Sequence, residues 1–594
     1  MNYQELQLFH GTLLNGSPRI ETLILQADQR YQFERGQTFS IGTITAIGNC
    51  SQTIVLESTS PGTPANFSSD NDNSVSFATL KGIHAQGAGT FTANESIDLG
   101  NNNGWTINPR SATDFYWVGN DDSWNNPANW SFSSGGPSSG CLPSIIDDVY
   151  FDANSFTITG QNVNINTENA YCRNMDWTGA TNMPTLTGSI NNTVRIGGSL
   201  TWIPDMNQSF NGLFSFESEQ AANTITTAGQ AFLFNLDFSG INGEWILQDD
   251  IYVEWRINLF SGTLRTNNQS VVANSFWSNQ SSSRSLYLGN SYVLLERHDN
   301  RIPIWEVSAT NLTMDAGNST IEMSSSSSTL FRSEGAGSMV YNNIILDAAA
   351  SSFFSLIYFP SPTVAVDSLI FLQGGFISGN NNVNYWEMAA GETYEFVSAS
   401  QQNITELAAN GDCENGLIYI RNDQTAQNSD FIIDNDHTFD RIYVQGIHQT
   451  GNGQLNVNNS IDGGYNLNWN FNDGSGRTLY WVGDAGDWSS QASWSLSSGG
   501  PGGECLPTPI DDVIFDTNSF SSPAPLITNV LGNSMYCHNM TWETGINNLP
   551  SIDANTIEIY GSLLLQSTLD WALVNTEFKG SDAHTIATND NALR

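Results

Sequence analysis

An aspartate-rich segment occurs twice in this chain, as DDVYFDAN at 147–154 and DDVIFDTN at 511–518. Carboxylates are preferred calcium ligands, and a carboxylate pair can also act as acid and base in sugar cleavage. Aspartate side chains equally bond their own backbone in turns, and the sequence favours this interpretation. The spacing does not fit an EF-hand loop. The candidate calcium ligands are Asp147, Asp148, Asp152, Asp511, Asp512 and Asp516.

The cysteines are Cys50, Cys141, Cys172, Cys413, Cys505 and Cys537. Cys141 and Cys172 are separated by about 30 residues, as are Cys505 and Cys537, so we expect a disulfide within each pair. Such a loop contributes roughly 3–4 kcal/mol in the chain-entropy model and implies an oxidising setting outside the cytoplasm. Cys50 and Cys413 are left as buried thiols, as partners across repeats, or as competitors for the other cysteines.

Tryptophans gather just before each aspartate segment. Exposed indoles stack on sugar rings, whereas buried indoles would cover the open end of a stacked β-structure. The sequence favours the covering role. The residues concerned are Trp117, Trp124, Trp130, Trp481, Trp488 and Trp494.

These motifs belong to a repeat of 364 residues, the spacing from Trp117 to Trp481. Self-similarity at a fixed spacing is the signature of an array. We expect residues 1–112 to be the C-terminal part of one unit and 113–476 to be a complete unit. The complete unit divides into a head, 113–180, and a body, 181–476, and 477–594 begins a further unit. The boundaries fall in polar stretches at 108–111 and 473–476.

The local pattern between these motifs is short apolar–polar alternation bounded by Gly, Asn, Ser or Asp, which indicates strands. No window has a convincing helical period. Asn-Asn pairs, as at 191–192, 267–268, 342–343, 458–459 and 547–548, suit the corners of stacked strands. We therefore predict an all-β chain of right-handed parallel β-helix or β-solenoid units, each beginning with a disulfide-closed, Trp-rich head. Tandem β-sandwich domains are the alternative.

The composition of the chain excludes some classes of binding partner. The formal net charge is −41, and Lys81 and Lys579 are the only lysines. Nucleic acids and anionic lipid surfaces need cations and are disfavoured. The sequence contains no apolar run long enough to span a bilayer, and its first residues lack the pattern of a signal peptide. Because both ends fall within a repeat, we expect the chain to be a segment of a longer protein.

Two sets of motifs carry a resemblance to a known group of proteins. The head contains YWVG at 116–119, Trp124, NWS at 129–131, CLP at 141–143 and DDVYFDANSF at 147–156, and the tail contains GTFTAN at 89–94. Together they resemble the repeats of very large Bacteroidota cell-surface proteins, adhesin-like substrates of the type IX secretion system. The resemblance covers essentially the whole chain. It implies an extracellular, elongated, repetitive protein and provides no catalytic residues to carry over.

The expected function is a structural and adhesive one, a stiff stalk or filament for surface attachment, gliding or cell–cell contact. The expected partners are further copies of the chain, in a homo-oligomeric fibre, and surface glycans or proteins of a target. Calcium is the one cofactor considered. The alternatives are a multivalent carbohydrate-binding array and a polysaccharide-degrading enzyme on a β-helix, although no catalytic set stands out and we expect no enzyme.

Overall fold

In a computed structural model of the chain, the short alternating runs form short strands. The chain is 52% strand and 1% helix, and its sheets form a parallel β-solenoid of about 24 turns. This architecture confirms the predicted β-solenoid. It differs from the alternative of tandem β-sandwich domains. The structure describes residues 2–60, 62–296, 304–325, 330–348, 353–355, 364–424, 426–471, 476–529, 535–553, 556–567, 569, 571, 575–580, 583–591 and 593.

The contacts divide the chain into two compact units, residues 1–324 with 333–342 and residues 325–332 with 343–594. The repeat boundaries expected at 112/113 and 476/477 therefore fall inside these units. The second of these linkers lies mostly outside the described residues. The repeat-based division of the chain stays a prediction.

Residues 2–109 of the first unit form their own twelve-stranded sheet. Neighbouring strands pair in parallel, so that Leu23 lies opposite Ile44, one turn later. The strands are β1 (Asn2–Leu8), β2 (Thr12–Leu14), β3 (Arg19–Leu25), β4 (Gln29–Phe33), β5 (Thr38–Ile47), β6 (Ile54–Ser58), β7 (Ala65–Ser68), β8 (Asn73–Ser76), β9 (Ala78–Lys81), β10 (Ile83–Gln86), β11 (Phe91–Asp98) and β12 (Trp105–Pro109).

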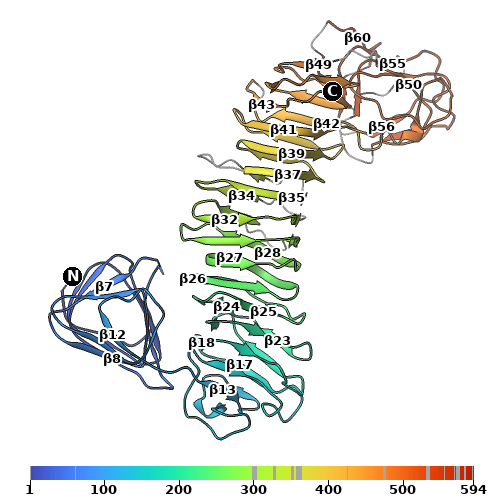
Figure 1. Cartoon of the computed structure of the whole chain (residues 1–594). Coiled ribbons are helices and arrows are strands. Elements are labelled where there is room, and N and C mark those ends of the chain that lie inside the picture. The colour runs from blue at the N-terminus through green and yellow to red at the C-terminus, as the bar shows by residue number, and fades with distance from the viewer. Residues whose placement is uncertain are drawn as a thin grey trace. The chain divides into compact units, whose positions relative to one another are not determined.

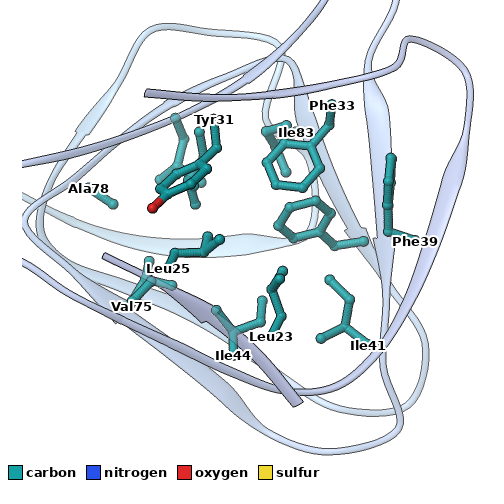
Figure 2. Packing of buried hydrophobic residues seen from close by; sticks show 14 of the residues in the cluster. Leu23, Leu25, Tyr31, Phe33, Phe39, Ile41, Ile44, Val75, Ala78 and Ile83 are labelled. Atoms are coloured by element: carbon teal, nitrogen blue, oxygen red, sulfur yellow. The ribbon is translucent and has the colours of Figure 1, made fainter. Parts of the chain in front are cut away.

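Alternate side chains of these strands point into the coil and form its core. Figure 2 shows Leu23, Leu25, Phe33 and Phe39 converging from different strands on one interior. Phe33 packs edge-on against Phe39, with ring centroids 5.1 Å apart. Period-two alternation thus places one face of every strand inside the coil, as the sequence pattern predicts.

The head of the first unit begins with β13 (Asp114–Trp117), which pairs antiparallel with β15 (Trp130–Ser131) and parallel with β16 (Asp148–Tyr150). A single 3-10 turn, Pro127–Asn129, precedes β15. The second unit repeats this arrangement with β50 (Thr478–Trp481), β51 (Trp494–Ser495), β52 (Asp512–Phe515) and the turn Gln491–Ser493.

Longer parallel rungs follow the first head and precede the second (Figure 1). In the first unit, β26 (Leu236–Leu247), β27 (Ile251–Arg265) and β28 (Val271–Ser278) stack with Leu236 opposite Ile257. In the second unit, β37 (Val364–Phe371), β39 (Asn381–Met388) and β41 (Gln401–Ala408) stack with Leu369 opposite Trp386 and Trp386 opposite Leu407. Each turn takes about 20 residues.

Asparagines occupy several corners, as expected. Asn267 and Asn268 adopt left-handed backbone angles, φ 54° and 64°, a conformation that asparagine tolerates. The Asn268 side chain accepts a bond from the Asn290 backbone N–H at 2.8 Å, and the Asn318 amide donates to Asn290 at 2.9 Å, which makes a ladder over three turns. The pair at 342–343 is an exception, because it lies within strand β35 (Met339–Ala348).

Candidate functional site: the tail–head junctions

Each unit contains a place where residues before an expected repeat boundary contact residues after it. We call residues 2–110 and 364–471 the first and second tail, and residues 113–217 and 476–579 the first and second front part. The first junction joins the first tail to the first front part, and the second junction joins the second pair. Each junction lies within one compact unit.

A disulfide closes each junction. Cys50 of the first tail bonds Cys141, and Cys413 of the second tail bonds Cys505, over sequence separations of 91 and 92 residues. The predicted pairs Cys141–Cys172 and Cys505–Cys537 are therefore wrong. Of the alternatives that the sequence left open for Cys50 and Cys413, pairing across repeats is the one formed.

The remaining cysteines explain the error. Cys172 and Cys537 are fully buried thiols, and burial raises the pKa of both. Cys172 lies in register with Ile196 on strands that face the solenoid core. Because the thiols of Cys172 and Cys537 are buried in the core, Cys141 and Cys505 bond the tail cysteines instead.

The first aspartate of each motif binds the linker between repeats. Asp147 is fully buried and accepts bonds from the Ser144 N–H at 2.8 Å, the Thr113 N–H at 2.9 Å and the Arg110 guanidinium. Its carboxylate thus holds the start of the head against the end of the tail. Removing one member of such a buried pair leaves the other charge without compensation.

Asp511 makes the same contacts in the second junction. It accepts from the Thr508 N–H at 2.9 Å and from the Arg477 N–H at 2.8 Å, and the Arg477 Nη2 donates at 2.7 Å. By the repeat spacing, Arg477 corresponds to Thr113 rather than to Arg110. A guanidinium therefore reaches the same carboxylate from a different position in each copy, a convergence that the sequence alone did not reveal.

The other aspartates have separate partners. Asp148 binds the Arg173 Nε at 2.7 Å, and Asp512 binds the His538 Nδ1 at 3.0 Å. Asp152 accepts from the backbone N–H two residues later at 2.9 Å, as does Asp516. These last two are the turns that the sequence favoured.

The structure does not gather the six candidate calcium ligands around a common point. Among the described residues, no group of three or more His, Cys, Asp or Glu side chains is placed to hold a metal ion. The calcium interpretation gains no geometric support from these carboxylates, and it stays a prediction.

The tryptophans form the core of each head. Trp117, Trp124, Trp130, Trp481, Trp488 and Trp494 are all 4% or less exposed. The Trp130 indole donates to the Trp124 carbonyl at 2.9 Å, and Trp494 does the same to Trp488. A sugar ring has no open indole face to stack on here, so these residues support the covering role rather than a glycan platform.

A cluster of charges lies across the first junction. In the first tail, the Arg30 Nε donates to the Glu57 Oε1 at 2.7 Å. In the first front part, Arg195 bonds Glu217, and Lys81 of the tail lies 4.0 Å from the same carboxylate. Burial alone would raise the pKa of Glu217, but Arg195, Lys81 and Arg30 outweigh it and hold this pKa well below its usual value.

The second junction has a different set of polar groups. The Arg421 Nε donates to the Glu395 Oε1 at 2.9 Å within the tail, and Lys579 pairs with Glu577 at 2.6 Å within the front part. Tyr419 of the tail lies beside Tyr536 of the front part, and burial followed by this neighbour raises the pKa of Tyr419 far above its usual value.

A polar cavity lies at each junction, of about 210 Å³ at the first and about 280 Å³ at the second. Four lining positions keep their residue type in both copies. They are Trp124, Leu142, Pro143 and Tyr171 at the first junction, and Trp488, Leu506, Pro507 and Tyr536 at the second. The charged lining residues differ between copies.

Sequence reasoning therefore found the right heads but the wrong closing contacts. It missed Arg110, Arg477 and the cluster around Glu217. Two signals were available, because Lys81 is one of only two lysines and Cys50 recurs as Cys413.

Comparison with known proteins adds no relative: the chain matches no family model, no curated protein and no solved structure. Within the described residues, no helix has the length and apolar character needed to cross a bilayer.

Proposed function

We propose that this chain is part of an extracellular structural protein whose repeats transmit tension in surface attachment, gliding or cell–cell contact. The observation that carries this proposal is the pair of disulfides that join each tail to the next head. Disulfides persist in oxidising compartments. The solenoid repeats its rungs, and a repetitive scaffold of this kind is suited to spacing and support.

The disulfides determine how a pull on the chain would be transmitted. Tension applied from both ends passes through the Cys50–Cys141 and Cys413–Cys505 bonds, so the loops that they close, including the linkers between repeats, are shielded from it. A covalent bond thereby bypasses the linker of each junction.

Single-molecule stretching of the whole chain tests the mechanical role. With the disulfides intact, full extension should be shorter than after reduction by about 600 Å, the length of two loops at about 3.4 Å per residue. Unfolding should also require distinct force peaks. A chain that extends smoothly, as a disordered polymer does, would contradict the proposal.

Surface labelling tests the location. An antibody against the chain, or a membrane-impermeant biotin reagent, should label it on intact cells. The type IX export route implied by the resemblance belongs to the same proposal. Loss of that secretion machinery should abolish the surface signal, and a signal confined to lysed cells would refute the extracellular part.

A further inference from the structure

The two junctions align position by position, because their strands have the same register. In the tails, β4, β6 and β9 correspond to β40 (Thr393–Phe396), β42 (Ile418–Asn422) and β45 (Ile442–Gln445). In the front parts, β18 (Asn169–Cys172), β21 (Thr193–Ile196) and β24 (Leu213–Phe216) correspond to β54 (Met535–Cys537), β57 (Ile557–Ile559) and β59 (Thr576–Phe578).

This alignment shows that charges change sign between the copies. Tyr171 lies opposite Arg195 in the first front part, and Tyr536 lies opposite Glu558 in the second. The residue after β24 is Glu217, whereas the residue after β59 is Lys579, and each donates its backbone N–H to the equivalent strand. The positions of the buried Arg195–Glu217 pair are thus occupied by Glu558 and Lys579 in the second copy, where the exposed Lys579 pairs with Glu577.

The tails change in the same way. Glu57 lies opposite Lys81 in the first tail, and its equivalent, Arg421, lies opposite Gln445 in the second. Each front part therefore faces a tail whose charges differ from those of the other tail. The disulfide and the shared Trp, Leu, Pro and Tyr positions at each junction do not change, whereas Tyr419 of the second cavity takes the place of Val55 in the first.

We propose that these charges select which tail docks on which front part, so that the apolar frame supplies a common docking surface and the charges specify the matching partner. The partner of each tail is thus the front part of its own junction rather than that of the other. Charge complementarity contributes to specificity mainly by penalising wrong pairs. This inference concerns assembly of the repeats and is independent of where the protein works.

A mismatched junction would bring like charges together. A front part with the second copy's charges would place a lysine at the position of Glu217, which lies 4.0 Å from Lys81 in the first junction. Glu217 and Lys81 are both less than 9% exposed, so solvent would screen this repulsion poorly.

The native disulfides give a local readout of docking in the full chain. The effective concentration of Cys50 for Cys141 can be measured by equilibration in glutathione buffers, followed by alkylation and mass spectrometry. Cys413–Cys505 serves as an internal reference in the same molecule. Arg195→Glu together with Glu217→Lys should lower the effective concentration at the first junction by about tenfold or more, with the second changed less than about twofold.

Adding the second tail's residues should then rescue the first junction. The added substitutions are Arg30→Thr, Gln32→Glu, Glu57→Arg and Lys81→Gln, and recovery to within about threefold of the unaltered chain is expected. Swapping the ion pair Arg265–Glu244, which lies outside both junctions, is the matched control and should change neither disulfide.

Lys81→Gln alone provides a milder test if the double substitution unfolds the unit, with an expected loss of about fivefold at the first junction. The proposal is overturned if the reversed front part leaves the Cys50–Cys141 value unchanged, or if the matching tail substitutions do not restore it.

Discussion

The first and second junctions keep the same covalent bond and the same buried aromatic frame, but they use opposite charges around that frame. Cys50–Cys141 and Cys413–Cys505 close loops of nearly equal length, and Trp130 and Trp494 make the same indole hydrogen bond. Glu217 and Lys579, by contrast, occupy one position with opposite signs. The disulfide and the buried aromatic residues of each junction are therefore the same in both copies, whereas the charged residues around them differ.

The largest expected effect comes from the disulfides, and it should be equal in the two junctions. Cys50→Ser or Cys413→Ser should each destabilise its own unit by about 4.6 kcal/mol, the chain-entropy contribution of a loop of about 90 residues. A denaturant titration, monitored by hydrogen exchange of the amides in each unit, measures the free energy of unfolding of that unit. Cys172→Ala is the control, because it should leave both disulfides in a non-reducing peptide map.

Loss of the aspartate that binds the linker should have the second largest effect on stability. Asp147→Ala leaves the Arg110 charge without its buried partner, and Asp511→Ala does the same to Arg477, so each should cost about 3 kcal/mol. Asp152→Ala removes only a turn contact and should cost about 1 kcal/mol or less. Equal losses for Asp147→Ala and Asp152→Ala in a denaturation series would contradict this assignment.

A half-buried carboxyl should give the first unit a pH dependence of its own. Burial raises the pKa of Asp237 to about 6, although a 2.7 Å bond from Asn258 opposes the rise. The unfolded state then ionises near pH 4 before the folded state does, so this group progressively destabilises the first unit as pH rises from about 4 to 6. Asp237→Asn should stabilise that unit by about 2 kcal/mol at pH 7 and have no effect at pH 3.

The second unit should show the opposite pH dependence at one corner. Asp484 corresponds to Asn120, and bonds from Ser522 and Ser521 lower the pKa of Asp484 to about 2. Its contribution is present above pH 4 and is lost as pH falls toward 2. Asp484→Asn should cost about 1 kcal/mol at pH 7, after allowance for solvent screening, and nothing at pH 2.

The smallest expected effect is that of calcium removal. Because Asp147, Asp148 and their copies are bonded to Arg or His side chains, EDTA should leave the melting temperature of both units unchanged. A fall of several degrees in either unit would show that calcium stabilises the fold at a site other than these bonded carboxylates.

Much of this architecture could be predicted from the sequence. The 364-residue spacing identified corresponding heads, period-two alternation indicated strands, and left-handed corners such as Asn267–Asn268 were expected from residue type. The burial of Trp117 and Trp481 also followed the favoured interpretation. The closing contacts could not be predicted, because Cys50 and Cys141, and likewise Lys81 and Glu217, are far apart along the chain.

The sequence by itself determined the strand period, the repeat and the inward tryptophans, since these depend on local alternation and on self-comparison. The tertiary structure decided which cysteine bonds which, which cation reaches Asp147 or Asp511, and which charges meet across each junction. The physical reason is that the length of each solenoid turn sets which distant residues become neighbours. An error of a few residues in that length moves a side chain to another face or another turn.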